Sequence, residues 1–318
     1  MLYIVLFCAL FCITVKGYSG KKVSCNVKTN DNAFLFNLLR MVFCIAVGLV
    51  FVFFEGSQEL LLPEFKMTAI CILAGAANSA CLVCWMLAVR KNSMVLVDVA
   101  LTLGSLLPSV LCLILFGEPF AFLKMIGFAI ILLATFILSS ADKQRIKKTA
   151  VGILLLVLAA LGDGLCGFSQ QLYKHFYTEG GSRVGDTVYP KTIYHLYTYV
   201  FSAVVIGAVL ISYRIFECRK SKHGTALDGA AQKERVLTVR VTIHLFVMAV
   251  CLFIANYLQT VATTDYGMSS QLMYPIIRGG TLVTVNIVSS LFFGETMTSR
   301  KIIGSLVAIL GVVVMSLV

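Results

Sequence analysis

The chain has 318 residues, of which 59% are hydrophobic and 13% charged, and its formal net charge is +11. One water-soluble domain cannot hide that much apolar surface in its core, so the composition excludes a soluble protein and places the chain in lipid. The basic residues stand in short loops between apolar runs. This pattern indicates membrane topology and argues against nucleic acid as a partner.

Ten apolar segments approach or reach the roughly 20 residues that a helix needs to cross a bilayer. None alternates with the period of a barrel strand, so we expect helices, which satisfy their own backbone hydrogen bonds in lipid. The first segment is short. It lacks a basic start and a small-x-small cleavage site, so we expect a retained span and not a signal peptide. In chain order the segments are 1–15, 33–54, 67–89, 94–116, 120–138, 151–173, 193–213, 241–261, 270–293 and 302–318.

One stretch occurs twice. Six of the twelve residues from 116 to 127 are identical to the residues 177 positions later, and both copies begin with Phe-Gly-Glu. Each copy closes an apolar array, so we predict two related halves, 1–140 and 149–318, joined by a basic linker, 141–148. Because each half has five spans, the second enters the membrane from the opposite side. The predicted fold is an all-α integral membrane protein with ten transmembrane helices in two inverted five-helix repeats.

The basic residues also predict the orientation. The odd-numbered loops hold 19 of the 26 Lys and Arg residues and the even-numbered loops hold 5. The positive-inside rule therefore places the odd loops in the cytosol and both termini outside. Of the 11 cysteines, Cys25 and Cys218 are expected in cytosolic loops. The others lie in apolar runs, where cysteine behaves as a small hydrophobic residue, and we expect no metal or redox site.

Charged residues inside the spans are the main candidates for a site, because each costs about 2.5–3.5 kcal/mol at a helix centre. Arg278 lies about nine residues into the ninth span, after Pro275, which favours a locally broken helix. Its guanidinium suits a carboxylate or phosphate group, or else forms a structural ion pair with Asp98 or Asp163. Asp163 is a proton site, a counter-ion or a structural hydrogen-bond partner. Asp98 lies near a span start, where simple solvation is an alternative.

Arg40 lies about seven residues inside the second span, where binding and snorkelling are both open. Asn78 and Asn256 fall at similar places in the two halves, and Trp85 either stacks on a substrate or packs. Glu118 and Glu295 of the repeated motif are assigned to structure, and His195 and Lys174 to anchoring at span ends. The predicted substrate-binding residues are Arg278, Asp163, Asn256, Tyr274, Arg40, Asn78, Trp85, Gln271 and Asp98.

The chain resembles the EamA type of the drug/metabolite transporter superfamily. The resemblance rests on the five-plus-five plan and on the repeated Phe-Gly-Glu motif with a glycine nine residues after its glutamate. It also rests on the stretch 273–295, MYPIIRGGTLVTVNIVSSLFFGE. It covers nearly the whole chain and implies transport of amino acids, drugs, nucleotide sugars or sugar phosphates. It also implies cytosolic termini, contrary to the loop charges.

We therefore expect a secondary transporter of the plasma membrane that moves a small metabolite by alternating access. The intramembrane arginines favour an anionic or zwitterionic substrate, such as an amino acid. No Walker motif is present, so coupling to H+ or Na+, or exchange, would supply the energy. The alternatives are a multidrug or cation exporter and a non-transporting receptor or assembly subunit. The four histidines form no zinc-binding pattern, so an enzyme is not expected. The expected partners are the substrate and membrane lipid, no cofactor is expected, and the chain is a monomer or homodimer.

Overall fold

The structure is a computed structural model. It describes residues 1–24, 26–27, 29–91, 94–117, 122–141, 150–177, 188–222, 237–293 and 298–316, with side chains for most of them. All secondary structure within these ranges is helical, which confirms the all-α class. The elements are α1 (Leu2–Ser24), α2 (Asn30–Glu55), the 3-10 turn η1 (Gln58–Leu60), α3 (Phe65–Lys91), α4 (Met94–Gly104), α5 (Leu106–Phe116), α6 (Phe122–Ala141), α7 (Ala150–Tyr177), α8 (Lys191–Lys222), α9 (Val239–Thr264), α10 (Ser270–Phe293) and α11 (Ser299–Ser316).

By length and composition, 7 helices of the described chain can cross a membrane. The protein is therefore a multi-pass membrane protein. The apolar stretches Ala100–Phe116 and Met125–Leu138 are helical but shorter. The seven membrane-spanning stretches are Leu2–Ser24, Asn30–Glu55, Phe65–Ala88, Ala150–Tyr177, Lys191–Arg219, Val239–Thr264 and Leu272–Phe292.

The first helix is longer than the sequence predicts. The apolar run ends at residue 15, but α1 continues to Ser24 and has 23 residues. The added turns are polar in composition, yet Ser19 and Val23 are buried. They stay helical because α1 packs along α9 over this length. The expected short first span is therefore wrong, and Lys16 lies inside a helix and not in a loop.

The predicted fourth span is broken into α4 and α5. Pro108 has no N–H, and its ring clashes with the carbonyl four residues earlier, that of Gly104, which is where α4 ends. The break packs against α7 almost backbone to backbone. A β-carbon on Gly104 would lie 2.3 Å from the carbonyl oxygen of Ala160, and one on Gly164 would lie 2.5 Å from the carbonyl oxygen of Gly104. The broken helix thus packs closely against the part of α7 that carries Asp163.

The ninth predicted span is continuous, against the expectation of a break at Pro275. Helix α10 runs from Ser270 to Phe293 with Pro275 inside it. Because Pro275 is near the helix start, only the carbonyl of Gln271, in the first turn, loses its helical hydrogen bond. Arg278 consequently projects from a regular helix.

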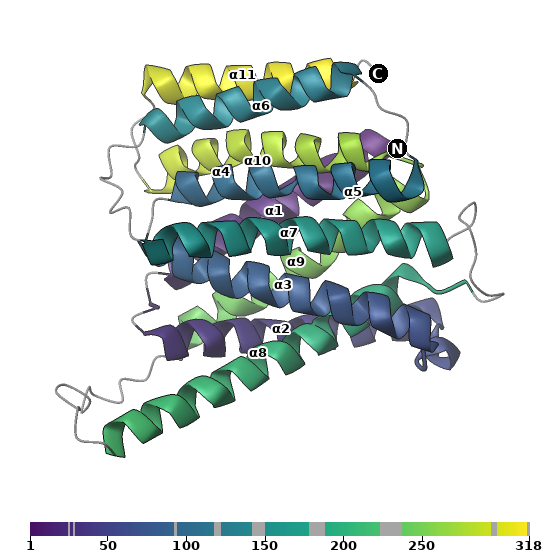
Figure 1. Cartoon of the computed structure of the whole chain (residues 1–318), viewed down its shortest axis with the longest axis vertical. Coiled ribbons are helices and arrows are strands. Elements are labelled where there is room, and N and C mark those ends of the chain that lie inside the picture. Colours follow the sequence, from purple (N-terminus) through teal and green to yellow (C-terminus); the bar gives the residue numbers. More distant parts are fainter. Residues whose placement is uncertain are drawn as a thin grey trace.

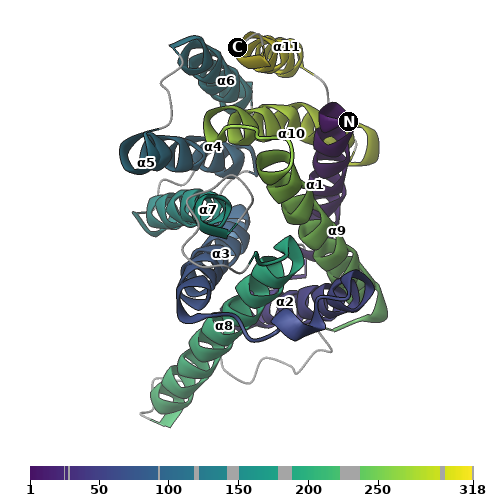
Figure 2. The same ribbon diagram turned by 90° about the vertical axis from the view of Figure 1, so that its right-hand side faces the viewer.

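The helices form a stack in which consecutive spans run in opposite directions (Figures 1 and 2). Helix α6 packs against α11 at one edge of the stack, and α2 packs against α8 near the other. Between these pairs, α3 packs on α7 and α1 packs on α9. The space between these inner helices contains the candidate site.

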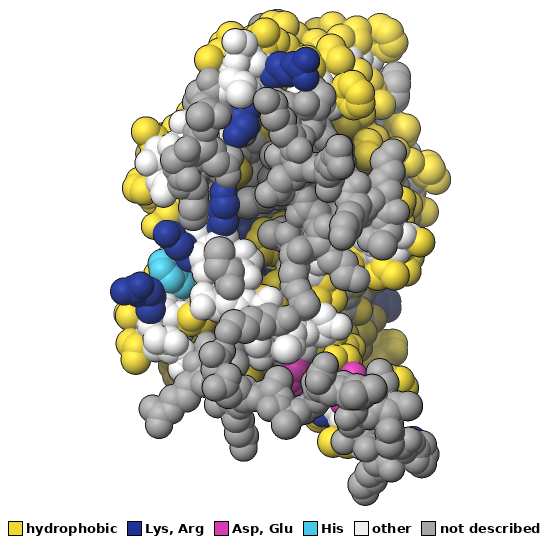
Figure 3. Space-filling model, turned by 90° about the vertical axis from the view of Figure 1, so that its left-hand side faces the viewer, with side chains coloured by type: hydrophobic (Ala, Val, Ile, Leu, Met, Phe, Trp, Pro, Cys, Tyr) yellow, Lys and Arg dark blue, Asp and Glu magenta, His cyan; other side chains and the backbone are white. Residues whose placement is uncertain are grey.

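Both termini lie at one end of the stack, on the right of Figure 1, while the helix ends that border the odd-numbered connections lie at the opposite end. We call these the terminal end and the basic end. Lys and Arg side chains are visible on the basic end (Figure 3). Several predicted features fall outside the described residues, namely Glu118, Glu295, Cys25 and most of the linker 141–148.

Replacing Gly104 with alanine should destabilise the protein by about 1–3 kcal/mol, because the added methyl group must push the α7 backbone away. The measurement is the thermal unfolding midpoint in detergent. The matched control is Gly207→Ala in α8, where a β-carbon meets only Leu38 at an ordinary 3.9 Å. An equal midpoint for the two variants would contradict the close packing at the helix break.

Candidate functional site

Two adjoining cavities of about 80 and 90 Å³ lie in the middle of the bundle, and together we call them the central cavity. Lys16 of α1, Asp163 of α7 and Arg278 of α10 line both. Each projects from the interior of its helix, well away from either helix end. The ionisable groups therefore lie deep within the membrane and face an internal space, not lipid.

Asp163 and Arg278 form an ion pair between Oδ2 and Nη2. Each side chain is 21% exposed, so both remain accessible from the cavity. Of the two carboxylates considered for Arg278, Asp163 is the one brought to it. The side chain of Asp98 lies outside the described part. The thiol of Cys81 completes this cluster, with its sulfur 4.0 Å from Oδ1 of Asp163.

Arg40 is 2% exposed and lines the same cavity. Its Nη2 donates to Oδ1 of Asn37 at 2.8 Å, one turn earlier on α2. Its Nε is buried without a hydrogen-bond partner. The alternative that Arg40 snorkels to the membrane surface is therefore wrong. The amide of Asn37 is neutral, so this hydrogen bond does not balance the charge of Arg40.

Lys16 is the residue that sequence reasoning missed. It makes no ion pair or hydrogen bond with a described residue, and it faces the central cavity between Arg40, Asp163 and Arg278. Across the described lining, three cations thus surround one carboxylate. A signal was present in the sequence, since Lys16 matches Lys174, 158 residues later, in the second half. Cys81, Gln170 and Gln259 are further lining residues outside the predicted set.

Neutral polar groups form the second wall of the cavity. Nδ2 of Asn78 donates to Oγ of Ser202 at 2.9 Å, and Nδ2 of Asn256 donates to the Tyr199 hydroxyl at 2.9 Å. These bonds leave the amide oxygens of both asparagines as acceptors. The Tyr274 hydroxyl donates to the Gly167 carbonyl at 2.6 Å. The cavity therefore combines a cationic wall with fixed, orienting hydrogen-bond groups.

The structure brings most of the predicted site residues together. Those that line the central cavity are Arg278, Asp163, Asn256, Tyr274, Arg40, Asn78 and Trp85. The side chains of Gln271 and Asp98 lie outside the described residues. His195, assigned to anchoring at a span end, is instead buried, with Nε2 2.9 Å from Oγ1 of Thr260. That assignment is wrong because α9 covers the imidazole.

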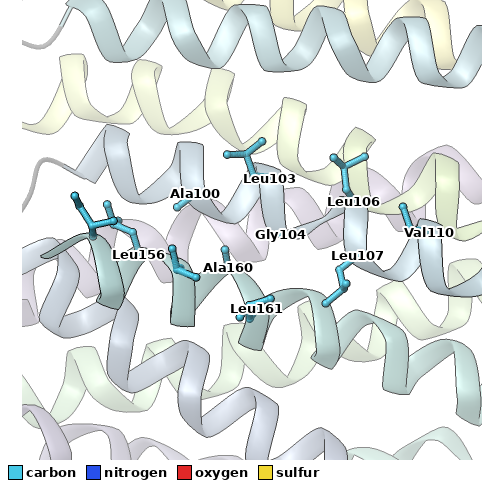
Figure 4. Close-up of a pocket in the computed structure, with 11 residues that line it drawn as sticks. Ala100, Leu103, Gly104, Leu106, Leu107, Val110, Leu156, Ala160 and Leu161 are labelled. Carbon is cyan, nitrogen blue, oxygen red and sulfur yellow. The ribbon is translucent and has the colours of Figure 1, made fainter. Parts of the chain in front are cut away.

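A larger hollow of about 540 Å³ lies on the outside of the bundle, where α4, α5 and α7 meet (Figure 4). Its lining is entirely apolar, and Leu103, Val110 and Leu161 are exposed. It offers no polar group to orient a substrate. We therefore assign the site to the smaller, charged central cavity.

Comparison with known proteins places the fold but not the activity. No protein-family model matches the sequence, and no curated protein is significantly similar to it. A solved crystal structure of another protein aligns with 99% of this chain and 96% of its own, with a TM-score of 0.72 and 13% sequence identity. At that identity the likeness concerns the fold alone.

The charge balance of the central cavity predicts unequal effects of removing the two partners of the ion pair. Asp163→Asn should lower the thermal midpoint more than Arg278→Gln. The first change leaves three cations without a carboxylate, whereas the second leaves Asp163 beside Lys16. Breaking a buried pair costs about 3–5 kcal/mol, and we expect about 2 kcal/mol or more here because the pair is partly accessible.

The double variant, Asp163→Asn with Arg278→Gln, should recover part of the stability lost in Asp163→Asn, because it removes the charge left unpaired. Thermal unfolding of all four proteins in one detergent measures this coupling. Additive losses, or a larger loss for Arg278→Gln than for Asp163→Asn, would contradict the proposed charge balance.

Proposed function

We propose that this protein is a secondary transporter that moves a small organic anion through the central cavity by alternating access. The observation that carries the proposal is the excess of cations in a cavity enclosed by helices of both halves of the chain. Lys16, Arg40 and Arg278 face it, and Asp163 is the single described carboxylate. The resemblance to drug/metabolite transporters agrees with this class.

The packing of the helices supports two inverted five-span repeats. If the halves are equivalent, α1 corresponds to α7, α2 to α8, α3 to α9, α4–α5 to α10, and α6 to α11. If helices are replaced by their counterparts, the contact between α1 and α9 predicts one between α7 and α3. The contact between α2 and α9 predicts one between α8 and α3. All four of these contacts are present. Likewise α4–α6 becomes α10–α11, which is also present. Such internal symmetry is the plan on which secondary transporters place a binding site between their halves.

Polar ties join the two halves at both ends of the bundle. At the terminal end, Glu55 of α2 accepts hydrogen bonds from Thr192 at 2.6 Å and from Tyr257 at 3.1 Å. At the basic end, Arg214 of α8 pairs with Asp31 of α2 at 2.8 Å. Asp31 and Glu55 are 24 positions apart on α2, so the two contacts are separated by about 36 Å. In alternating access, the hydrogen bonds of Glu55 and the ion pair of Asp31 would break in turn, so that the cavity opens to one side of the membrane at a time.

The substrate class follows from electrostatics. Cations in a cavity of low dielectric are stabilised by a counter-anion far more than the same cations in water. Arginine binds carboxylate or phosphate oxygens with two parallel hydrogen bonds, and lysine adds a point charge. A substrate with one or two negative charges would balance the described lining. A lipophilic cation would be repelled, so the structure gives no support to a cation exporter.

The proposed orientation keeps the basic end in the cytosol. With Lys16 set aside because it lies deep in α1, 18 basic residues remain in the odd connections and on the helix ends beside them, against 5 for the even connections. The positive-inside rule therefore still applies. We place the transporter in the plasma membrane, with an ion gradient or exchange as its source of energy.

Lys16→Gln should raise the KM for an anionic substrate about tenfold or more, since a hydrogen bond to a charged group contributes about 1.5–3 kcal/mol. Uptake of the substrate into proteoliposomes measures this. Lys66→Gln, the same charge change at an exposed position at the start of α3, is the matched control and should leave KM unchanged. Equal kinetics for the two variants would remove Lys16 from the site.

A thermal-shift screen of the purified protein tests the substrate class itself. The panel contains phosphate monoesters, dicarboxylates, amino acids and quaternary ammonium cations. We expect an anion to raise the unfolding midpoint of the wild-type protein and to lose that effect in Arg278→Ala. Stabilisation by organic cations alone would overturn the proposed substrate class. An anion effect that persists in Arg278→Ala would place the site elsewhere.

A further inference from the structure

A second polar hollow lies at the basic end of the bundle, where α1 ends and α9 begins. Its volume is about 510 Å³, and it shares no residue with the central cavity. Val23 and Val241 form its buried base. We call it the α1–α9 pocket, and its full lining is Lys22, Val23, Asn26, Thr238, Arg240, Val241 and His244.

The lining of the α1–α9 pocket is cationic. Lys22 approaches from the last turn of α1, and Arg240 and His244 approach from the first two turns of α9. None of the lining residues is acidic. Thr238, the residue before α9, makes no side-chain capping bond, so its hydroxyl does not occupy the amide groups of that first turn. Three cationic or protonatable side chains and a helix N-terminus thus meet in one concave site.

Aromatic contacts hold two of these side chains in place. Nζ of Lys22 lies 5.8 Å from the ring centroid of Tyr18, one turn earlier on α1. The Tyr18 ring also lies edge-to-face with the ring of His244, at 6.4 Å between centroids. The ring of Phe292 of α10 also packs edge-to-face with Tyr18, at 5.4 Å between centroids. Tyr18 thus ties Lys22 and His244 to one place at the rim of the pocket, while the side chains of Lys22 and Arg240 stay exposed and open to a ligand from outside.

The position of the pocket relative to lipid points to its ligand. Val239, Ile243 and Phe246, which follow along α9, are exposed on the outside of the bundle. Phe292, at the end of α10 beside Tyr18, is exposed as well. An apolar surface of this kind faces acyl chains, and the basic end of the helices lies at the level of the lipid headgroups. The other Lys and Arg side chains on this end (Figure 3) favour the approach of anionic lipids.

We propose that the α1–α9 pocket binds the phosphate-bearing headgroup of an anionic phospholipid. Arg240 would hold phosphate oxygens with paired hydrogen bonds, and Lys22 would supply a second positive charge. The acyl chains would lie along the exposed apolar side of α9. This assignment is independent of the transported substrate, because the pocket and the central cavity share no lining residue.

The test is lipid binding by the full chain, purified in a neutral detergent and measured by native mass spectrometry. The probes are phosphatidylinositol bisphosphate and, as a zwitterionic control, phosphatidylcholine. We expect the first to bind more tightly. Lys22→Ala with Arg240→Ala should weaken its binding about thirtyfold, from about fivefold for each basic residue near a membrane surface. Arg300→Ala with Lys301→Ala removes the same charge from the same end but outside the pocket lining, and should therefore change binding much less.

Additional variants and a soluble headgroup distinguish binding in this pocket from general attraction to charge and from binding of a soluble phosphate. Lys22→Arg with Arg240→Lys keeps both charges and should retain binding, which shows that the pocket tolerates substitution at these positions. Equal losses in the two alanine double variants would indicate attraction to charge in general and would overturn the site. Binding of inositol trisphosphate as tightly as the whole lipid would overturn a lipid as the ligand in favour of a soluble phosphate. Unchanged binding in the Lys22→Ala, Arg240→Ala variant would overturn the proposal outright.

Discussion

Three cations and one carboxylate occupy an enclosed space in the middle of a lipid-facing bundle, and the surrounding structure depends on keeping them out of lipid. Each charge costs about 2.5–3.5 kcal/mol at a helix centre when it lacks compensation. The ion pair of Asp163 with Arg278 compensates two of them. Lys16 and Arg40 have no described carboxylate of their own, so they are tolerated because helices from both halves close around a polar cavity.

The sequence reveals the site where a charge interrupts an apolar run. Arg278, Asp163 and Arg40 stand out for this reason, and all three line the central cavity. Lys16 does not stand out, because its apolar run ends one residue earlier and the next residues resemble a loop. Whether α1 continues depends on its packing along α9, which is a tertiary contact that local sequence does not encode. The burial of His195 is likewise set by a tertiary contact, with Thr260 of α9, and the local sequence does not reveal it.

The two prolines within the described helices show the limit of local rules for backbone shape. Pro275 and Pro108 both lie in apolar spans, and the rule that proline removes a helical hydrogen bond applies to both. The helix is interrupted at Ser105, three residues before Pro108, but is continuous through Pro275. The difference is the position of each proline relative to the helix start, because α10 begins only five residues before Pro275 whereas α4 begins well before Pro108. The all-α class follows from composition, but the point where a helix breaks requires knowledge of where it starts.

The break between α4 and α5 also has a mechanical consequence. The carbonyl oxygen of Gly104 lies against Gly164, and Ala160 lies against Gly104, so α7 is wedged at two points by the end of α4. Asp163 stands between those points on α7. Sliding α7 along its own axis would drive its backbone into the end of α4 unless the angle between α4 and α5 changed as well. Any movement of Asp163 with α7 along the helix axis therefore requires the helix break at Gly104, 59 residues earlier in the chain, to move as well.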